Sequence, residues 1–253
     1  MTPEEFLERA GPLLLADEAR NNLILGLAGT ADEYAEARFW LVDGAAALRT
    51  PPYNLVLATP RDDDALRALV AAIDEELPGV SGTAPEVYAF AELWGRPWRV
   101  VQEQNVLEAD RLVAAEAPGG YRDARPDDTD QLLDWWEAFV REAVPHEPVG
   151  PRDPERFKRR PVGVWEDAGA LVSMCGYGAP TPNGMRIGPV FTPPELRGRG
   201  YASALTAEVS RRQLAAGWRF CFLYTDARNP TSNRIYEAIG YRRIAEAAAI
   251  AFE

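Results

Sequence analysis

The chain has 253 residues, of which 47% are hydrophobic and 26% are charged, with 39 acidic residues against 27 basic ones. This composition is that of a globular protein and excludes a disordered tail, a collagen-like repeat and a small disulfide scaffold. The formal net charge of −12 opposes binding to phosphate backbones and anionic lipids. We therefore expect no nucleic-acid or membrane partner.

The first part of the chain predicts helices, a hairpin and short strands. Residues 3–15 and 17–27 are predicted as helices, the second with Asp17 as its cap. Strands at 37–42 and 48–50 flank Asp43-Gly44, a pair typical of hairpin turns. The remaining predicted elements are a strand at 55–58, a helix that begins after Asp62-Asp63-Asp64, a helix at 85–94 and a strand at 100–107.

Pro118-Gly119-Gly120 is the strongest linker candidate, because proline and glycine interrupt both helix and strand. It predicts two domains, residues 1–117 and residues 118–253. The charge divides in the same way. Residues 1–120 hold 9 basic and 21 acidic residues, whereas residues 121–253 hold 18 of each.

The second part repeats the order of elements. Helices are predicted at 130–142, from about 201 to 216 and at 230–239, and strands at 162–165, 170–177, 185–192, 220–225, 241–244 and 248–252. Strands that alternate with helices, through both hairpin and parallel connections, predict a mixed α/β (α+β) sheet flanked by helices.

The segment Arg197-Gly198-Arg199-Gly200-Tyr201-Ala202-Ser203 joins a strand directly to a helix. Glycines leave backbone N–H groups uncovered there, and a helix N-terminus favours a phosphate or pyrophosphate. The segment lacks the Gly-Lys-Ser/Thr of a Walker loop and the third glycine of a Rossmann fingerprint. An ordinary glycine turn ahead of a helix is the alternative interpretation.

Arg197-x-x-Gly200-x-Ala202 resembles the Arg/Gln-x-x-Gly-x-Gly/Ala signature of the GNAT superfamily of N-acetyltransferases. The resemblance implies a GNAT-like fold and acetyl-CoA as the cofactor. It implies that loop amides hold the pyrophosphate and that the preceding strand end pairs with the pantetheine arm. The cofactor contacts so implied are Val190, Phe191, Thr192, Arg197, Gly198, Arg199, Gly200, Tyr201, Ala202 and Ser203.

A second segment, residues 229–241, is similar to the family pattern Asn-x-x-(Ser/Ala)-x-x-x-Tyr-x-x-x-Gly-(Phe/Tyr). Asn229 is suited to cap a helix, and helical spacing places Asn229, Ser232 and Tyr236 on one side. The resemblance implies that Asn229 and Ser232 contact the cofactor. It also implies that the Tyr236 phenol is the catalytic acid that protonates the departing thiolate.

Other reactive residue types lack a distinguishing pattern. Glu137, Glu142 and Glu147 lie near the expected acceptor site, but their spacing singles out none of them as the general base. Cys175 and Cys221 stand alone in apolar runs, which predicts buried, reduced thiols and a cytoplasmic protein. With His146 as the single histidine, we expect no metal site.

Residues 1–117 resemble a degenerate copy of the same fold, so that the chain is predicted as two tandem domains of similar topology. The stretch after the strand at 55–58 has no glycine and three carboxylates at Asp62-Asp63-Asp64, where a pyrophosphate would bind. Like charges at such a site oppose binding. The acidic first part is therefore predicted as a scaffold or as a wall of the acceptor cleft.

The expected activity is transfer of an acetyl group from acetyl-CoA to a primary amine of a small molecule or peptide. Direct attack in a ternary complex is the expected mechanism, because no nucleophile is placed for an acyl-enzyme. The alternative is a non-catalytic acyl-CoA-binding sensor or assembly module. The expected assembly is a monomer or a homodimer.

Overall fold

The computed structural model describes residues 1–34, 36–145 and 152–253. Its strands form one eleven-stranded sheet in the order β1-β2-β3-β4-β11-β5-β10-β9-β8-β7-β6. The strands are β1 (Arg38–Val42), β2 (Ala45–Arg49), β3 (Leu55–Leu57), β4 (Gly79–Thr83), β5 (Trp98–Ala109), β6 (Gly120–Asp123), β7 (Val162–Asp167), β8 (Ala170–Gly178), β9 (Gly184–Phe191), β10 (Phe220–Asp226) and β11 (Arg242–Phe252). The helices are α1 (Pro3–Ala16), α2 (Asn22–Gly29), α3 (Asp63–Ala72), α4 (Glu86–Trp94), α5 (Thr129–Ala143), α6 (Pro154–Phe157), α7 (Tyr201–Ala215) and α8 (Pro230–Ala238), with short 3₁₀ turns at Ala31–Glu33, Pro126–Asp128 and Pro194–Leu196.

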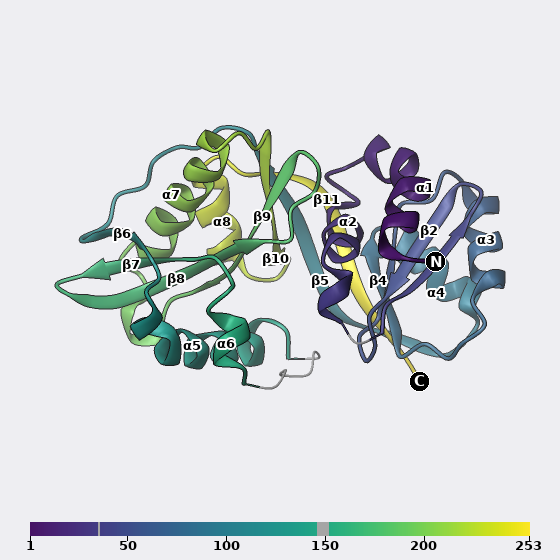
Figure 1. Ribbon diagram of the computed structural model, residues 1–253, viewed down its shortest axis with the longest axis horizontal. Helices are drawn as coiled ribbons and strands as arrows, with labels where there is room; N and C mark the ends of the chain where they lie inside the picture. The colour runs from purple at the N-terminus through teal and green to yellow at the C-terminus, as the bar shows by residue number, and fades with distance from the viewer. Residues whose placement is uncertain (35, 146–151) are drawn as a thin grey trace.

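Helices cover both faces of this sheet, as Figure 1 shows. We call β1–β4 with α1–α4 the N-terminal lobe and β6–β10 with α5–α8 the C-terminal lobe. In the N-terminal lobe one core packs under α3 and α4 and another under α1 and α2. In the C-terminal lobe one core packs under α7 and another under α5 and α6. The predicted mixed sheet flanked by helices is confirmed.

Local sequence signals explain where several helices begin. Thr2 and Glu5 form a capping box at the start of α1. Asp62 caps α3, since its side chain accepts a hydrogen bond from the Ala65 amide at 2.8 Å. Asn229 caps α8 in the same way. Each cap satisfies a backbone N–H that has no partner inside its helix.

The two lobes share strands β5 and β11. β5 pairs with β10 from Gln104 to Ala109, and with β11 over nearly its whole length. Residues 247–251 of β11 lie between β5 and β4 and pair with both strands, one on each edge. The proposed boundary at 117/118 therefore separates β5 in sequence from the strand β10 that it pairs with, and the division into two domains stays a prediction.

The order of elements repeats along the chain, from β1-β2-β3-α3-β4-α4-β5 to β7-β8-β9-α7-β10-α8-β11. In each set one pair of strands is parallel, β3 with β4 and β9 with β10. β3 and β4 therefore occupy the positions in the N-terminal lobe that correspond to those of β9 and β10 in the C-terminal lobe.

Several local predictions differ from the structure, and β6 and α6 also lie where no strand or helix was predicted. Asp17 is the C-cap residue of α1 and does not cap α2, which begins five residues later. The two strands predicted at 241–244 and 248–252 are one strand, β11, with a register shift between Arg243 and Ala245. Gly79–Thr83 forms a strand that the sequence did not indicate, because its two glycines are more typical of a turn.

Side chains of β5 show which helices lie on the same face of the sheet. Gln102 donates to the Ala143 carbonyl at the end of α5 at 2.7 Å, and Gln104 lies beside α2. Leu107 and Ala109, of the opposite register, enter the core under α7. Because side chains alternate along a strand, α2 and α5 cover one face and α7 covers the other.

Among the described helices, none has the length and apolar character that a membrane-crossing segment needs.

Candidate functional site

The parallel strands β9 and β10 separate part of the way along their length. They pair at Gly184–Phe220, Met185–Cys221 and Arg186–Phe222, and the pairing ends there. β9 nevertheless continues to Phe191 and β10 to Asp226. Backbone N–H and C=O groups beyond the last pair therefore face an opening between the two strands, where a ligand with an amide chain has partners.

The irregular end of β9 contributes to this opening. Ile187 pairs with Tyr177 and Val190 pairs with Cys175, so Gly188 and Pro189 lie opposite the single residue Gly176. This is a β-bulge, which bends a strand and redirects its end. Val190, predicted as a cofactor contact, lies just past the bulge and is half-buried.

The loop after β9 presents six consecutive free amides. Within the part of the chain that the structure describes, the backbone N–H groups of residues 198–203 donate to no acceptor. Gly198 and Gly200 adopt positive φ angles of 77° and 84°, and α7 begins at Tyr201 with no side-chain cap. Uncapped amides at the start of a fifteen-residue helix form an anion site, because the helix dipole adds to them. The predicted free amides are confirmed over this range.

The prediction is wrong for the amide of Arg197, which donates to the Pro194 carbonyl at 3.3 Å. The Arg197 guanidinium is also occupied. Its Nε donates to the Thr192 carbonyl at 2.9 Å, and its Nη2 pairs with Glu142 at 2.7 Å. Arg197 therefore fastens the loop to the end of β9 and to α5. Arg199 is exposed, and no carboxylate among the described residues pairs with it.

Three other predicted contacts direct their side chains into the protein. Tyr201 is 3% exposed and donates to Asp167 at 2.5 Å. The Thr192 hydroxyl lies 2.9 Å from that of Ser173, and Phe191 packs on Trp135. Of their backbone groups, the Tyr201 amide donates to none of the described residues, whereas the carbonyls of Phe191 and Thr192 accept from Ser173 and Arg197. Ala202 and Ser203 are half-buried in the first turn of α7.

A residue that sequence analysis missed holds the loop between β10 and α8. Asn233 donates through Nδ2 to the carbonyls of Asp226, Ala227 and Asn229, at 3.1, 3.4 and 2.9 Å. Its Oδ1 accepts from Asn105 of β5 at 3.1 Å. The sequence signal was its place next to Ser232 in the second segment. Asn229 uses its side chain on the Ser232 amide, at 3.1 Å, so it holds the start of α8.

The Tyr236 side chain lies where α8 meets the core of the C-terminal lobe. Its ring packs edge-on against Tyr241, with 6.1 Å between ring centroids. Its hydroxyl makes no hydrogen bond to any of the described residues. Burial raises the pKa of Tyr236 well above its ordinary value, and the neighbouring Cys175 thiol adds to this. The phenol therefore keeps its proton throughout the neutral range.

The other candidates carry less chemistry. Glu137 pairs with Arg152 and Arg141, and Glu142 pairs with Arg197, whereas Glu147 and His146 lie outside the described residues. Cys175 and Cys221 are fully buried, and desolvation raises the pKa of Cys221 to about 12. A buried thiol of that kind is not a nucleophile at neutral pH. The described residues contain no group of His, Cys, Asp and Glu side chains placed to hold a metal ion.

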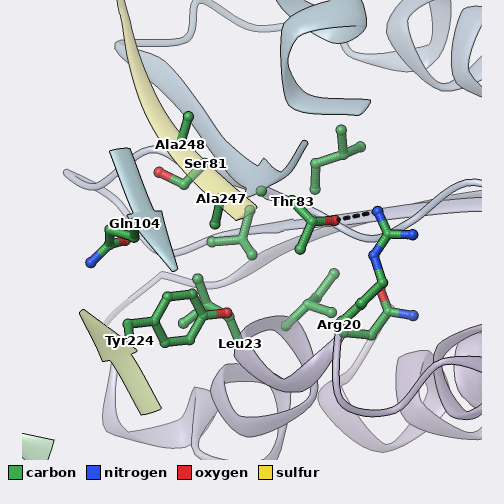
Figure 2. Close-up of a pocket in the computed structure, with 13 residues that line it drawn as sticks. Arg20, Leu23, Ser81, Thr83, Gln104, Tyr224, Ala247 and Ala248 are labelled. Atoms are coloured by element: carbon green, nitrogen blue, oxygen red, sulfur yellow. Dashed lines mark hydrogen bonds between the residues drawn. The ribbon is translucent and has the colours of Figure 1, made fainter. Parts of the chain in front are cut away.

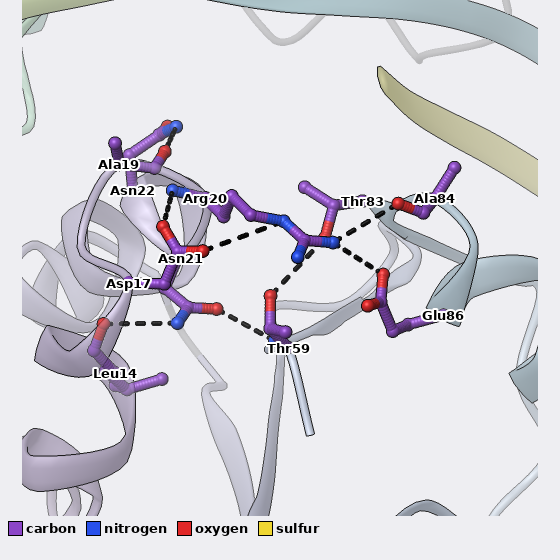
Figure 3. A network of polar contacts seen from close by, with 10 residues as sticks. All are labelled: Leu14, Asp17, Ala19, Arg20, Asn21, Asn22, Thr59, Thr83, Ala84 and Glu86. Atoms are coloured by element: carbon purple, nitrogen blue, oxygen red, sulfur yellow. Dashed lines mark hydrogen bonds and ion pairs between the residues drawn. The ribbon is translucent and has the colours of Figure 1, made fainter. Parts of the chain in front are cut away.

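In the N-terminal lobe the corresponding strand ends are closed by the lobe's own side chains (Figure 3). Arg20 donates to the Thr83 hydroxyl at 3.3 Å and to the Ala84 carbonyl at 3.2 Å, and it pairs with Glu86 at 2.7 Å. The Asn21 side chain accepts from the Thr59 amide at 2.8 Å. The N-terminus of α3 already carries the Asp62 carboxylate, so no open anion site exists there among the described residues.

Helix α2 lies over strands of the C-terminal lobe as well. A cavity of about 20 Å³ lies beneath it and is lined by Leu23 and Arg20 on one side and by Gln104 and Tyr224 on the other. Figure 2 shows Tyr224 of β10 beside Leu23 of α2. At Gly26 of α2, an added Cβ would meet the Ala179 carbonyl at 2.7 Å. The first part of the chain thus packs directly on the sheet face next to the β9–β10 opening.

Comparisons with known proteins identify the fold to which this geometry belongs. Residues 162–250 match the family model described as FR47-like protein. No curated protein matches the sequence. Among solved structures, a GCN5-related N-acetyltransferase from Kribbella flavida is similar over 92% of this chain and 95% of its own, at 18% identity and a TM-score of 0.62.

Two further structures show the same fold. A GCN5-related N-acetyltransferase from Sphaerobacter thermophilus is 21% identical, with 88% of this chain and 84% of its own covered and a TM-score of 0.57. A Drosophila protein is 13% identical, with 100% and 97% covered and a TM-score of 0.68. The sheet and the free-amide loop define a protein with the GNAT fold. The GNAT-like fold that the resemblance implied is confirmed, and residues 162–250 of this chain match the FR47-like family model.

Proposed function

We propose that the chain is an acetyl-CoA-dependent N-acetyltransferase that acetylates a primary amine of a small molecule or peptide. The observation that carries this proposal is the row of six free amides at residues 198–203, at the start of α7 and next to the β9–β10 opening. The similarity to structures described as N-acetyltransferases supports the same class of activity.

The residues present suit coenzyme A. The amides of residues 198–203 would hold its diphosphate, and the exposed Arg199 adds positive charge beside them. A Cβ added at Gly198 would meet nothing within 4 Å, so there is open space beside the first of these amides. The unpaired backbone of β9 and β10 beyond Arg186 and Phe222 would pair with the amide-containing arm. When bound, acetyl-CoA supplies the acetyl group as a thioester.

Tyr236 serves as the proton donor. Its Oη has no partner among the described residues and its pKa is raised by burial, so it holds a proton for the sulfur that departs. The backbone N–H at the end of β9, near Val190, is suited to stabilise negative charge on the thioester oxygen. No nucleophilic side chain is needed, because the amine attacks directly when both substrates are bound.

The first part of the chain has a structural role in the proposed enzyme. We propose residues 1–117 as a degenerate domain without a coenzyme site, since Arg20, Asn21 and Asp62 occupy the backbone groups that would bind one. Its helix α2 forms one wall of the acceptor cleft, beside Tyr224. Residues 118–253 form the proposed catalytic domain.

Two measurements test the proposal. Titration calorimetry measures the affinity of the protein for acetyl-CoA. We expect Gly198→Ala to weaken this binding while leaving the fold intact. Release of free thiol from acetyl-CoA with a panel of primary amines then reads transfer. Tight binding without amine-dependent thiol release would instead identify a non-catalytic acyl-CoA sensor. The absence of any binding would contradict both functions.

A further inference from the structure

Arg186 of β9 is a half-buried cation to which none of the described residues supplies a counter-ion. Its guanidinium makes no hydrogen bond or ion pair with any of the described residues. The other arginines whose side chains are described as half-buried each bind a carboxylate, and they are paired as Arg20 with Glu86, Arg49 with Glu75 and Arg122 with Asp128. Removing a cation from water without a partner is costly, so Arg186 is the exception that calls for a ligand.

The position of the guanidinium relates it to the proposed site. Arg186 pairs across the strands with Phe222, yet its guanidinium lies over the ring of Tyr224, with 5.6 Å from Cζ to the ring centroid. Tyr224 is two residues further along β10, past the last β9–β10 pair. The Arg186 side chain therefore leans toward the opening between the strands, on the sheet face that α2 covers.

No carboxylate within residues 1–34, 36–145 and 152–253 pairs with this charge. Its cross-strand neighbours are Gly178 on β8 and Phe222 on β10, neither of which is ionisable. Glu18 reaches the start of β9 from the α1–α2 turn, but it uses both carboxylate oxygens on Asn183, at 2.7 Å each. A cation–π contact with Tyr224 orients the guanidinium and leaves its N–H edge available.

We propose that Arg186, held over Tyr224, binds a carboxylate of the acceptor, so that the acceptor is an amino acid or another amine that carries a carboxylate. The inference rests on the proposed function and gives its substrate class. Guanidinium and carboxylate match as two parallel hydrogen bonds, which fixes the orientation of the bound molecule as well as its affinity. A carboxylate held at Arg186 leaves the amino end free to reach the opening.

Matched pairs of amines test this. Each amino acid is compared with its own carboxamide, for glycine, β-alanine and 4-aminobutyrate, and 2-aminoethyl phosphate is compared with 2-aminoethanol. We expect at least one carboxylate to exceed its carboxamide in kcat/KM by about 10- to 100-fold, as a charge-assisted bidentate contact provides. The chain length with the largest ratio gives the distance between amine and carboxylate. A larger ratio for the phosphate pair would overturn the carboxylate assignment.

Variants separate binding from packing. In Arg186→Gln we expect the carboxylate-to-carboxamide ratio to fall to about one, while kcat/KM for the carboxamides stays within about twofold. The melting temperature should stay the same or rise, because an uncompensated cation is removed. A role confined to packing on Tyr224 would lower the melting temperature and leave the ratio unchanged, and that result would overturn the proposal. Arg9→Gln, an exposed arginine of α1, controls for loss of charge.

A binding measurement keeps this test independent of transfer. The same pairs are titrated by calorimetry into protein saturated with coenzyme A. Preferential binding of the carboxylates that is lost in Arg186→Gln supports the carboxylate subsite. If no amine releases thiol in the same protein, the proposed transfer activity is contradicted and the subsite is still supported. Equal binding of carboxylates and carboxamides overturns the subsite, whereas amine-dependent thiol release would then still support the transferase.

Discussion

The sequence motifs predict functional roles for both Tyr236 and Arg197, but the contacts of the two side chains in the structure differ. The Tyr236 hydroxyl lies beside the C-terminal core and bonds to no residue that the structure describes, which suits a proton donor. The Arg197 guanidinium donates to the Thr192 carbonyl and to Glu142, so this side chain holds the loop in place. The sequence motif identifies both positions. Only the contacts separate a group that is free to act from one that holds the backbone.

Replacing Tyr236 by phenylalanine removes a hydroxyl that has no partner among the described residues, so the fold should tolerate the change. We expect kcat to fall by roughly 10²- to 10⁴-fold, the usual contribution of a general acid. The affinity for acetyl-CoA should stay within a few-fold, because the amides of residues 198–203 are unaltered. Thiol release and calorimetry on the same variant check this, and an unchanged kcat would rule out Tyr236 as the acid.

The raised pKa of Tyr236 also sets the pH dependence. The proton-bearing form is the active one, and an upward shift extends its range to higher pH. A primary amine, with a pKa near 10, gains its free form over the same interval. We therefore expect kcat/KM to rise from pH 6 to pH 9.5 without an alkaline decline. A decline with an apparent pKa near 9 in the wild type, absent from Tyr236→Phe, would contradict the raised pKa.

At the scale of elements, α3 follows β3 and α7 follows β9, the first strand of each parallel pair, and these two helices begin differently. Asp62 places a carboxylate on the first turn of α3, whereas α7 begins after Gly200 with no cap and with free amides. The same helix position is thus closed to anions in one lobe and open in the other. Sequence alone indicated this contrast, since three carboxylates stand at one helix start and two glycines at the other.

Gly198 and Gly217 offer a matched pair for testing the open helix start. Both have positive φ angles, 77° and 107°, and an added Cβ would meet nothing within 4 Å at either site. Alanine should therefore cost about 1–2 kcal/mol of unfolding free energy in each case. We expect only Gly198→Ala to weaken acetyl-CoA binding, because Gly217 lies past the far end of α7. Equal losses of binding in both variants would remove the loop from the proposed site.

The sequence predicted most elements but not how distant ones pair. Hydrophobic periodicity and capping residues gave α1, α3, α5 and α7 nearly to their ends. The place of β5 between β10 and β11 depends on hydrogen bonds between segments more than a hundred residues apart, which no local pattern encodes. Arg186 was visible as a strand residue. That no described residue supplies its counter-ion depends on how distant segments pack around it.

At the scale of the molecule, the shared strands predict the behaviour of fragments. Residues 118–253 lack β5, which leaves β10 and β11 without their common neighbour and removes Leu107 and Ala109 from the core under α7. We expect this fragment not to unfold cooperatively, whereas residues 98–253, which restore β5, should regain a cooperative transition. Urea unfolding followed by circular dichroism compares them. A stable, coenzyme-binding fragment 118–253 would show that the lobes fold separately.

β5 is one continuous strand that pairs with β10 of the C-terminal lobe on one edge and with the shared strand β11 on the other, and β11 in turn pairs with β4 of the N-terminal lobe. Hinge-bending of one lobe against the other would shear these ladders, at the loss of many backbone hydrogen bonds together. Substrates must therefore enter by rearrangement of loops and side chains at the rim. The radius of gyration in small-angle scattering should be the same for the empty and the saturated protein.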